Sequence, residues 1–292
     1  MAFSLMGAIL LVSGCLAHRC ISPTALGNMG HNINSEANDY APVLRDTATL
    51  IFTSNRAEAD RTGLHEAHRE DRPAQFYMTM RLGLEWDKAD LYDLLFVNES
   101  EREAATLTFA PTPNVLNAIA YLASHNGGGE AGDYDIFMVP NGGGNLVSPG
   151  PKLNSPGWDG HPFITADGSR LYFASERSGG YGGTDIWYVE QEKNGLWGAP
   201  RNAGSEINTS GDELSPFVES TTGDLYFAAS TQRDSLDLFV LPAGSKRRES
   251  LPPPYNSAAG EITPFIKNGK LYLASNRDGG CGGYDLYMFP LR

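Results

Sequence analysis

The sequence predicts an all-β protein, a β-propeller of five four-stranded blades. Short apolar segments recur along the chain, and the prolines that begin them lie 69, 51, 54 and 48 residues apart: Pro42, Pro111, Pro162, Pro216 and Pro264. Glycine is common, at 33 of 292 residues, as expected for many tight turns. Periods of about 50 residues are typical of propeller blades or solenoid units. Six blades are the alternative, because the 69-residue interval has room for a degenerate blade.

Each repeat begins with two apolar segments around a tight turn. The clearest copies are PFITADGSRLYFAS at 162–175, PFVESTTGDLYFAAS at 216–230 and PFIKNGKLYLAS at 264–275. We expect the first strand to begin at the proline, where a missing N–H is tolerated, and a hairpin turn at pairs such as Asp167-Gly168. The second strand is apolar on both faces, which favours a sheet packed between other sheets.

A third strand follows each hairpin after a loop. It is predicted at 75–80, 135–139, 185–189, 237–241 and 285–289. We expect a fourth strand through 197–200 and its counterpart at 86–89, which completes a four-stranded blade. Residues 25–35 are similar to the segment that ends at Ile207, so an amino-terminal strand should complete the last blade and close the ring.

Charge and hydrophobicity limit the classes of function. The chain has 35 Asp and Glu against 22 Lys and Arg, a net charge of -13. This balance excludes a general nucleic-acid binder, which needs cationic side chains for the phosphates, and disfavours docking on anionic lipid. Hydrophobic residues make up 41% of the chain, enough for a core. No apolar run approaches the roughly 20 residues that cross a bilayer.

The amino terminus resembles a bacterial lipoprotein signal. Residues 1–14 are apolar and small, Val12-Ser13-Gly14 would be the lipobox, and Cys15 would receive the lipid. No Lys or Arg precedes the apolar stretch, where export signals normally carry positive charge, so a short buried strand or a misplaced start codon is the alternative. We expect residues 1–22 to be signal and tether, and residues 23–292 to be a single propeller domain.

A second repeated element precedes the prolines. It reads apolar-Asn-Ser/Thr, three residues, Asp or Glu, two residues, Pro, with repeats starting near 33, 153, 207 and 255. A fifth repeat starts near 97 and has Thr108 in place of the acid. The acids are Asp39, Asp159, Glu213 and Glu261. As a ring at the channel mouth they are a candidate metal site for Ca²⁺, which prefers several oxygen ligands. Alternatively each acid caps its own loop, which repetition at one position favours. No other cofactor is expected.

One face of the ring should carry the conspicuous loops, because strands alternate in direction. Arg56, Arg177 and Arg277 follow the second strands there, and His125 and Asn276 begin two glycine-rich loops; we take these five as ligand-binding candidates. The alternative for the arginines is an ion pair with the aspartate that begins the third strand (Asp185, Asp237 or Asp285). A strand follows each glycine loop, whereas a phosphate-binding loop precedes a helix, so these loops are expected to be tight turns.

The repeats resemble a known family. The segments HPFITADGSRLYFASERSGGYGGTDIWYV at 161–189 and ASNRDGGCGGYDLYMF at 274–289 are similar to the TolB-like, WD-repeat-like β-propellers of bacterial envelopes. The resemblance covers about residues 31–292. It implies a propeller with a role in envelope complexes, and it is specific for fold rather than for activity, because propellers host many functions.

Two further features bear on the loop face. Cys20 should begin the closing strand, a strand length of about 20 Å from Cys281, whereas bridged Cα atoms lie about 4.4–6.8 Å apart, so no Cys20–Cys281 disulfide is expected. The insertion at 57–74 contains His65 and His68, which do not form the His-Glu-x-x-His zinc signature. We expect a solvated charged loop that is a candidate for partner contacts.

These observations favour a non-catalytic binding or scaffold lipoprotein of the bacterial cell envelope. The predicted protein is a monomeric propeller on the periplasmic face of the outer membrane, held to the membrane only through its lipid. It would present its loop face to an envelope protein or a cell-wall glycan. The alternative is a propeller glycosidase that uses the channel-mouth acids. Glycosidases need two carboxyl groups in different environments, whereas these acids occupy equivalent positions. No Gly-x-Ser-x-Gly motif indicates a peptidase.

Overall fold

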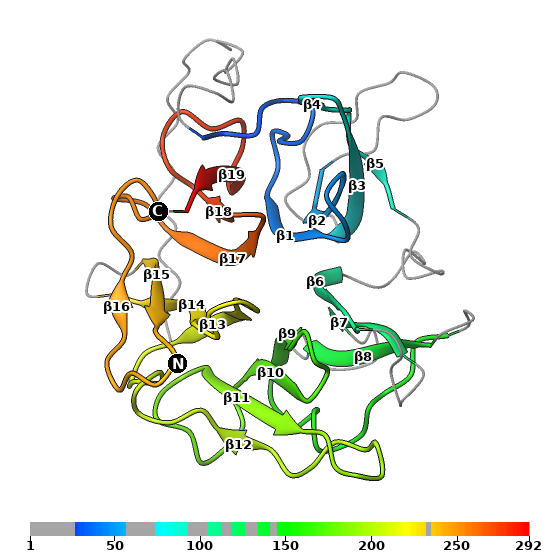
Figure 1. Ribbon diagram of the computed structural model, residues 1–292, viewed down its shortest axis with the longest axis vertical. Helices are drawn as coiled ribbons and strands as arrows, with labels where there is room; N and C mark the ends of the chain where they lie inside the picture. The colour runs from blue at the N-terminus through cyan, green and yellow to red at the C-terminus, as the bar shows by residue number, and fades with distance from the viewer. Residues whose placement is uncertain are drawn as a thin grey trace, which may run out of the picture.

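The computed structural model describes residues 27–56, 74–92, 104–111, 118–125, 134–140, 145–231 and 235–291. Within these ranges the chain forms strands and no helix, so these residues include no helix that could cross a membrane. The strands make five antiparallel sheets arranged as a ring around a central axis (Figure 1). The prediction of an all-β, five-bladed propeller is confirmed, and the six-bladed alternative is wrong.

Each sheet is one blade, numbered in chain order. Blade 1 contains β1 (Asp39–Leu44), β2 (Thr49–Ser54), β3 (Gln75–Leu82) and β4 (Glu85–Trp86), with β5 (Asp90–Leu91) also paired to β3. Blade 2 contains β6 (Ala104–Phe109), β7 (Ala118–His125) and β8 (Tyr134–Pro140). Blade 3 contains β9 (Asp159–Ile164), β10 (Arg170–Ser175), β11 (Asp185–Glu190) and β12 (Arg201–Asn202).

Blades 4 and 5 complete the ring. Blade 4 contains β13 (Glu213–Val218), β14 (Leu225–Ser230), β15 (Leu236–Leu241) and β16 (Glu249–Ser250). Blade 5 contains β17 (Glu261–Lys267), β18 (Lys270–Ser275) and β19 (Asp285–Pro290). The fourth strands are short, and the one expected at 197–200 lies instead at β12, with Trp197 in a bridge to Gln191.

The first strands line the central channel. In blade 2 the expected start at Pro111 is wrong, because β6 ends at Phe109, and Ala104 rather than Thr108 takes the position of the acid. The other four first strands contain a β-bulge before the proline. They begin at the acidic residue, three residues before the expected position. The residue directly before the proline has a positive φ of 53°, 48°, 54° and 51° at Ala41, His161, Ser215 and Thr263. The strand register shifts at this point. Proline cannot donate to the ladder, and a bulge is one of the few places in a sheet that tolerates it.

The central channel is nearly filled by side chains. The cavity between the five first strands measures only about 60 Å³, room for a few water molecules at most. Phe217 packs against Phe163 and Phe265, with ring centroids 4.9 and 5.1 Å apart. His161 accepts a hydrogen bond from Ser215 N at 3.1 Å, and burial lowers the pKa of His161 to about 4. The channel itself therefore offers no room for a ligand.

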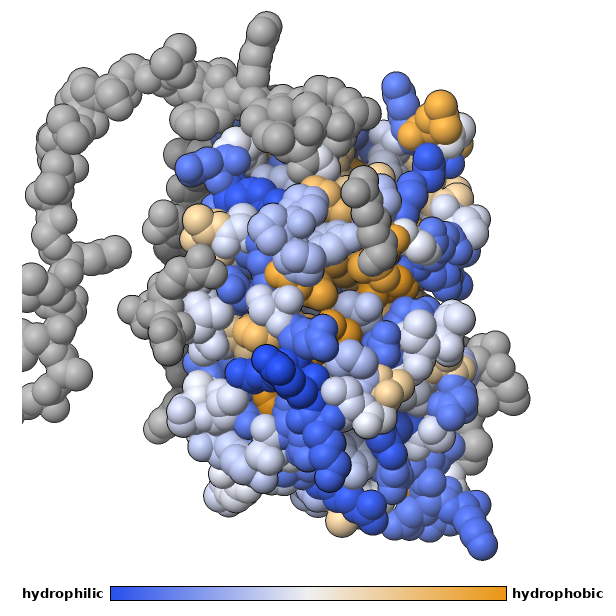
Figure 2. All heavy atoms as spheres, turned by 60° about the vertical axis from the view of Figure 1, so that its left-hand side comes forward, coloured by the Kyte–Doolittle hydropathy of each residue, from blue (hydrophilic) through white to orange (hydrophobic). Residues whose placement is uncertain are grey.

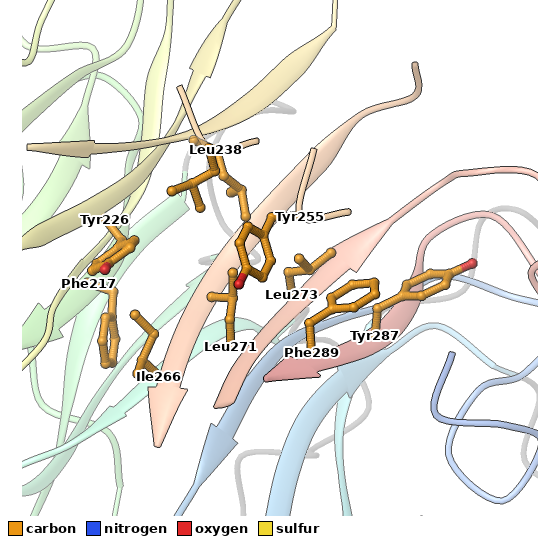
Figure 3. Close-up of a cluster of buried hydrophobic side chains, with 11 residues drawn as sticks. Phe217, Tyr226, Leu238, Tyr255, Ile266, Leu271, Leu273, Tyr287 and Phe289 are labelled. Carbon is orange, nitrogen blue, oxygen red and sulfur yellow. The ribbon is translucent and has the colours of Figure 1, made fainter. Parts of the chain in front are cut away.

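Hydrophobic packing between neighbouring blades forms the core. Among the described residues, buried apolar side chains gather in five clusters, one at each junction between blades. At the junction of blades 4 and 5, Tyr226 and Leu238 lie with Leu271, Leu273 and Tyr255 (Figure 3). This packing explains why the second strands are apolar on both faces: β2, for example, is buried throughout.

An asparagine side chain joins each of four blades to the blade before it. Asn208, which precedes blade 4, accepts a hydrogen bond from Ile186 N at 2.8 Å and donates one to Ile186 O at 2.9 Å, in β11 of blade 3. The amide thus occupies the edge of β11 as a strand residue would. The same pair of bonds joins Asn34 to Leu286, Asn154 to Ile136 and Asn256 to Leu238. We call these four side chains the asparagine clamps.

Residues near the amino terminus contact the last blade. Asn28 forms an isolated antiparallel bridge with Tyr287 of β19, flanked by hydrogen bonds from Met29 N to Leu286 O at 3.0 Å and from Met288 N to Gly27 O at 2.8 Å. The expected closing strand is represented by this bridge rather than by a regular strand. The expected domain boundary at residue 23 lies outside the described residues.

Cys281 lies in a disulfide bond. The other two cysteines of the chain, Cys15 and Cys20, are outside the described residues. Because the partner of Cys281 lies outside the described residues, the expectation that Cys20 and Cys281 are not joined to each other stays a prediction.

We expect Asn208→Ala to lower the free energy of unfolding by about 2–4 kcal/mol, because it leaves a buried N–H and a buried C=O of Ile186 without partners. Urea denaturation measures this change. Asn194→Ala is the matched control at an exposed turn, where water replaces the lost bond to Leu196 N, and it should cost less than about 0.5 kcal/mol. Equal effects of the two substitutions would show that the clamp does not stabilise the ring.

Candidate functional site

The acidic and arginine candidates meet in pairs on the loop face. Asp159, fully buried at the start of β9, lies 2.8 Å from Arg177 Nη2 and also accepts a hydrogen bond from Ser155 N. Arg177 donates further hydrogen bonds to Leu153 O at 2.7 Å, Lys152 O at 3.1 Å and Ser175 Oγ at 2.8 Å. Four of its five N–H groups are therefore used within the blade.

The same pair recurs in three other blades. The distances from arginine to acid are 2.5 Å for Arg56–Asp39, 3.2 Å for Arg277–Glu261 and 3.4 Å for Arg248–Glu213. Each acid also accepts a backbone N–H, from Ser35, Ser257 or Thr209 respectively. The acid side chains have 0% exposure, and those of the arginines 9% to 24%. In the structure each of these acids therefore caps its own loop, as the alternative to a metal site expects.

Each arginine also packs on aromatic rings. The guanidinium of Arg177 lies 4.6 Å from the ring centroid of Phe173, and that of Arg56 lies 4.6 Å from the ring of Tyr77. The cation on the ring face adds attraction to the ion pair, most strongly where water is excluded. The acid, the arginine and the rings beneath it, from the second and third strands or in blade 5 from the third strand alone, therefore form one structural unit in each of these blades.

The alternative pairing of the arginines with the third-strand aspartate is wrong. Asp185 Oδ2 instead accepts hydrogen bonds from Tyr181 N at 2.5 Å and Asn202 Nδ2 at 2.8 Å. Asp285 likewise caps the glycine loop of blade 5 through Cys281 N. These carboxylates hold the loops, which leaves the arginines to the first-strand acids.

Arg248 was not among the sequence candidates. In blade 4, Thr231 follows the second strand at the position that Arg177 and Arg277 occupy in blades 3 and 5. Arg248, just before β16, reaches Glu213 from another direction and donates to Ile207 O at 2.7 Å. The sequence signal for this pairing is the absence of an arginine at position 231. A buried Glu213 carboxylate without that arginine needs a cation from another part of the chain.

The structure does not gather the four acids into one cluster. No group of three or more His, Cys, Asp or Glu side chains suited to a metal ion occurs within the part of the chain described. Each acid is held instead by its own serine or threonine and its own arginine. The Ca²⁺ site at Asp39, Asp159, Glu213 and Glu261 stays a prediction that these contacts do not support.

The glycine loops allow close contact between blades. A Cβ on Gly182 would lie 2.4 Å from Gly211 O of blade 4, and one on Gly282 would lie 2.1 Å from Ala37 O of blade 1. Real Cβ atoms essentially never approach so closely, so only glycine fits. Gly183 N and Gly283 N then donate to Gly211 O and Ala37 O, at 3.0 and 3.1 Å. These loops cover the junctions between blades 3 and 4 and between blades 5 and 1.

The remaining candidates are separate. Asn276 Oδ1 accepts a hydrogen bond from Gly260 N at 2.7 Å. His125 packs edge-on against Tyr134, with ring centroids 5.8 Å apart. The insertion at 57–74, with its two histidines, lies outside the described residues except for Ala74, and so does Cys15. The structure does not bring Asn276 and His125 together.

Two hollows bordered by described residues lie outside the channel. One, of about 1010 Å³, is bordered by the segment 27–32, Trp86, Pro254 and Phe289. The other, of about 450 Å³, lies between blades 4 and 5 and includes Asn276. Figure 2 brings the side of blades 4 and 5 forward and shows hydrophobic residues gathered in the middle of a largely hydrophilic face. These hollows, unlike the channel, are large enough for small ligands.

No protein-family model and no curated protein matches the sequence. Solved structures are similar in fold. The endo-arabinase from Bacteroides thetaiotaomicron VPI-5482 is 13% identical, with 91% of this chain and 96% of that chain covered and a TM-score of 0.51. A family 43 β-1,3-galactosidase is 10% identical, with 89% and 91% covered and a TM-score of 0.50. A putative TolB from Agrobacterium tumefaciens is 15% identical, with 82% and 70% covered and a TM-score of 0.45. The similarities to the endo-arabinase and the galactosidase show the fold alone.

We expect Arg177→Met to lower the free energy of unfolding by about 3–5 kcal/mol, because Asp159 would be left buried without its cation. Arg170→Met is the matched control: Arg170 pairs with Glu190 at 2.6 Å, but both side chains are more than a third exposed, so the loss should be at most about 1 kcal/mol. Thermal and urea unfolding measure both. Losses of similar size would contradict a larger contribution of the buried ion pair to the free energy of unfolding.

Burial raises the pKa of Asp285 to about 6, above its ordinary 3.8. The folded protein therefore keeps a proton that the unfolded chain releases between about pH 4 and 6, so the contribution of Asp285 to stability is largest below pH 4 and falls as the pH rises through 6. We expect wild type to lose stability relative to Asp285→Asn over this range in urea titrations. A difference that is constant, or that grows in favour of wild type, would contradict the raised pKa.

Proposed function

We propose that this protein is a non-catalytic binding module of the bacterial cell envelope, which presents its loop face to an envelope protein or a cell-wall glycan. One observation carries the proposal. The four acids that a hydrolase would need at the channel mouth are fully buried, and each is bound by an arginine and a backbone N–H. Groups bound in this way are not free to exchange protons with a substrate.

Two further points argue against the glycosidase alternative. The acids occupy equivalent environments, whereas an acid and a base in glycoside hydrolysis need different ones. The channel between the first strands has only about 60 Å³ of space and phenylalanine side chains within it, so no sugar can enter it. The similarity to glycoside hydrolases of known structure is one of fold, and folds host many functions.

The proposed location rests on the amino-terminal sequence and on Cys281. Residues 1–14 are apolar and are followed by Cys15, the proposed lipidation site, which would hold the protein on the periplasmic face of the outer membrane. The disulfide at Cys281 fits an oxidising compartment such as the periplasm. We propose a monomeric propeller whose membrane attachment is through the lipid alone.

Capture of a partner from native envelope membranes tests the binding role. We expect wild type to retain a defined protein or glycan that is lost with Tyr181→Lys, which places a charge on a side chain 53% exposed on the loop face. Deletion of 57–74 tests the insertion in the same way. Ala166→Lys, at the exposed turn between β9 and β10 on the opposite face, should retain the partner. Equal capture by all variants would contradict binding at the loop face.

A screen for arabinan and xylan hydrolysis tests the enzymatic alternative. We expect no turnover by wild type. Turnover that Asp159→Asn abolishes, with the variant still folded by circular dichroism, would overturn the binding-module proposal.

A further inference from the structure

At one junction of the ring, the described residues do not make a contact between blades that is found at two others. At the junctions of blades 3 and 4 and of blades 5 and 1, a glycine loop reaches the turn that leads into the next blade. There Thr184 N donates to Asp212 Oδ1 and Tyr284 N donates to Asn38 Oδ1, both at 2.9 Å. The equivalent residue before the first strand of blade 5 is Gly260, which has no side chain to accept such a bond.

The loop of blade 4 is also different. Six residues separate Ser230 from Asp237, against eight between Asn276 and Asp285, and none of the six is glycine. The sequence thus departs from that of the other two junctions in both the loop and the residue before the first strand. A cavity of about 450 Å³ lies there, within the range typical of small-ligand sites.

Two polar side chains in this cavity have unused hydrogen-bonding groups. Asn276 uses its oxygen for Gly260 N, and its Nδ2 makes no hydrogen bond among the described residues. Tyr284 lies beside Gly260, and its hydroxyl likewise has no hydrogen-bond partner in the described part of the chain. Burial raises the pKa of Tyr284, so the hydroxyl stays protonated and can donate.

The opposite wall supplies acceptors and apolar surface. Asp212 accepts from Thr184 N and, at 3.3 Å, from Ser230 Oγ, and its carboxylate oxygens retain further lone pairs. Leu214 and Leu236 complete the wall. Among the described residues that line the cavity, Asp212 is the one charged side chain, and its negative charge disfavours an anion such as phosphate.

We propose that this cavity binds a neutral sugar ring. Vicinal hydroxyls both donate and accept, which matches a carboxylate on one wall and an amide and a phenol on the other. An ammonium ligand would use only the acceptors and leave the Asn276 amide nitrogen unpaired. The tyrosine ring and the leucines offer apolar surface to the C–H groups of the sugar. The inference rests on the proposed binding function and gives it a ligand class.

Binding of simple methyl glycosides tests the inference. The probes are methyl β-galactopyranoside and methyl β-N-acetylglucosaminide, with inorganic phosphate as the anionic comparison, studied by saturation-transfer NMR and calorimetry. We expect at least one glycoside to bind wild type with a millimolar Kd, and phosphate not to bind. Binding of phosphate, or of neither glycoside, would overturn the inference.

Three variants connect any binding to the cavity. Gly260→Asn gives blade 5 the residue that blade 1 has at Asn38. Its Cβ would lie 2.8 Å from the hydroxyl at the far end of Tyr284 and in ordinary contact, at 3.4 Å, with Asn276 Oδ1, so we expect a folded protein with no glycoside binding. Tyr284→Phe removes one hydroxyl that has no described partner and should weaken binding about five- to tenfold without changing Tm. Tyr181→Phe, at an exposed tyrosine of the blade 3 loop, is the matched control and should bind as wild type does. Unchanged binding by a folded Gly260→Asn would overturn the inference.

The two proposals fail separately. Envelope capture that survives in Gly260→Asn, together with no glycoside binding by wild type, would reject the sugar site and keep a binding module for a protein partner. Glycoside binding that is lost in Gly260→Asn would support the sugar site even if capture from membranes fails.

Discussion

The asparagine clamps are the interaction on which the rest of the ring depends. A third strand has a free edge wherever the fourth strand is only two residues long, as β12 and β16 are. A free edge leaves N–H and C=O groups that must be bonded when they are buried. The amide of Asn208 or Asn256 satisfies one donor and one acceptor of the preceding blade at once. The clamp also fixes the start of the turn that leads into the next first strand.

The buried acids follow from the position of that turn. One residue after each clamp, a serine or threonine N–H points at the acid that opens the first strand, as Thr209 does for Glu213. A buried carboxylate needs more than one donor, and the arginine on the aromatic rings supplies the balancing charge. The clamp, the acid and the arginine therefore form a chain of dependent contacts that runs from one blade to the next. Repetition of these residues reports a structural requirement, which must be met at each of these junctions.

Much of the fold could be predicted from the sequence because the repeats carry it. Prolines, hairpin turns and paired apolar strands recur along the chain and mark the blades, except that Pro111 follows the first strand of blade 2 instead of lying within it. The partner of each arginine could not be predicted from spacing, because Ser175 pairs with both Asp159 and Asp185 in the sheet and Arg177 lies within reach of either. Arg177 pairs with Asp159 because Asp185 already accepts hydrogen bonds from Tyr181 N and Asn202 Nδ2. These two contacts become apparent only in the folded structure.

Residues that depart from the repeat pattern were harder to recognise in the sequence than the pattern itself. Gly260 and Thr231 look like ordinary variation in a loop, yet one removes a contact between blades and the other leaves Glu213 to be paired by Arg248. In a ring of near-identical units, symmetric features hold the units together, and an asymmetric one is where a single ligand can distinguish one junction from the others. The candidate site consequently could not be identified from the most repeated residues, which are those that the fold uses.

The contacts of Gly27, Asn28 and Met29 with β19 have a mechanical consequence. They join the beginning of the described chain to its last blade, across a separation of more than 250 residues, and Asn34 adds a clamp at the same junction. Tension applied from the amino-terminal side reaches the ring at blade 5, through these bonds and through the disulfide of Cys281 in the loop before β19. In a protein tethered at that end, the junction between blades 5 and 1 would therefore be the first part of the ring to carry load, and its strength would limit the pull that the propeller withstands.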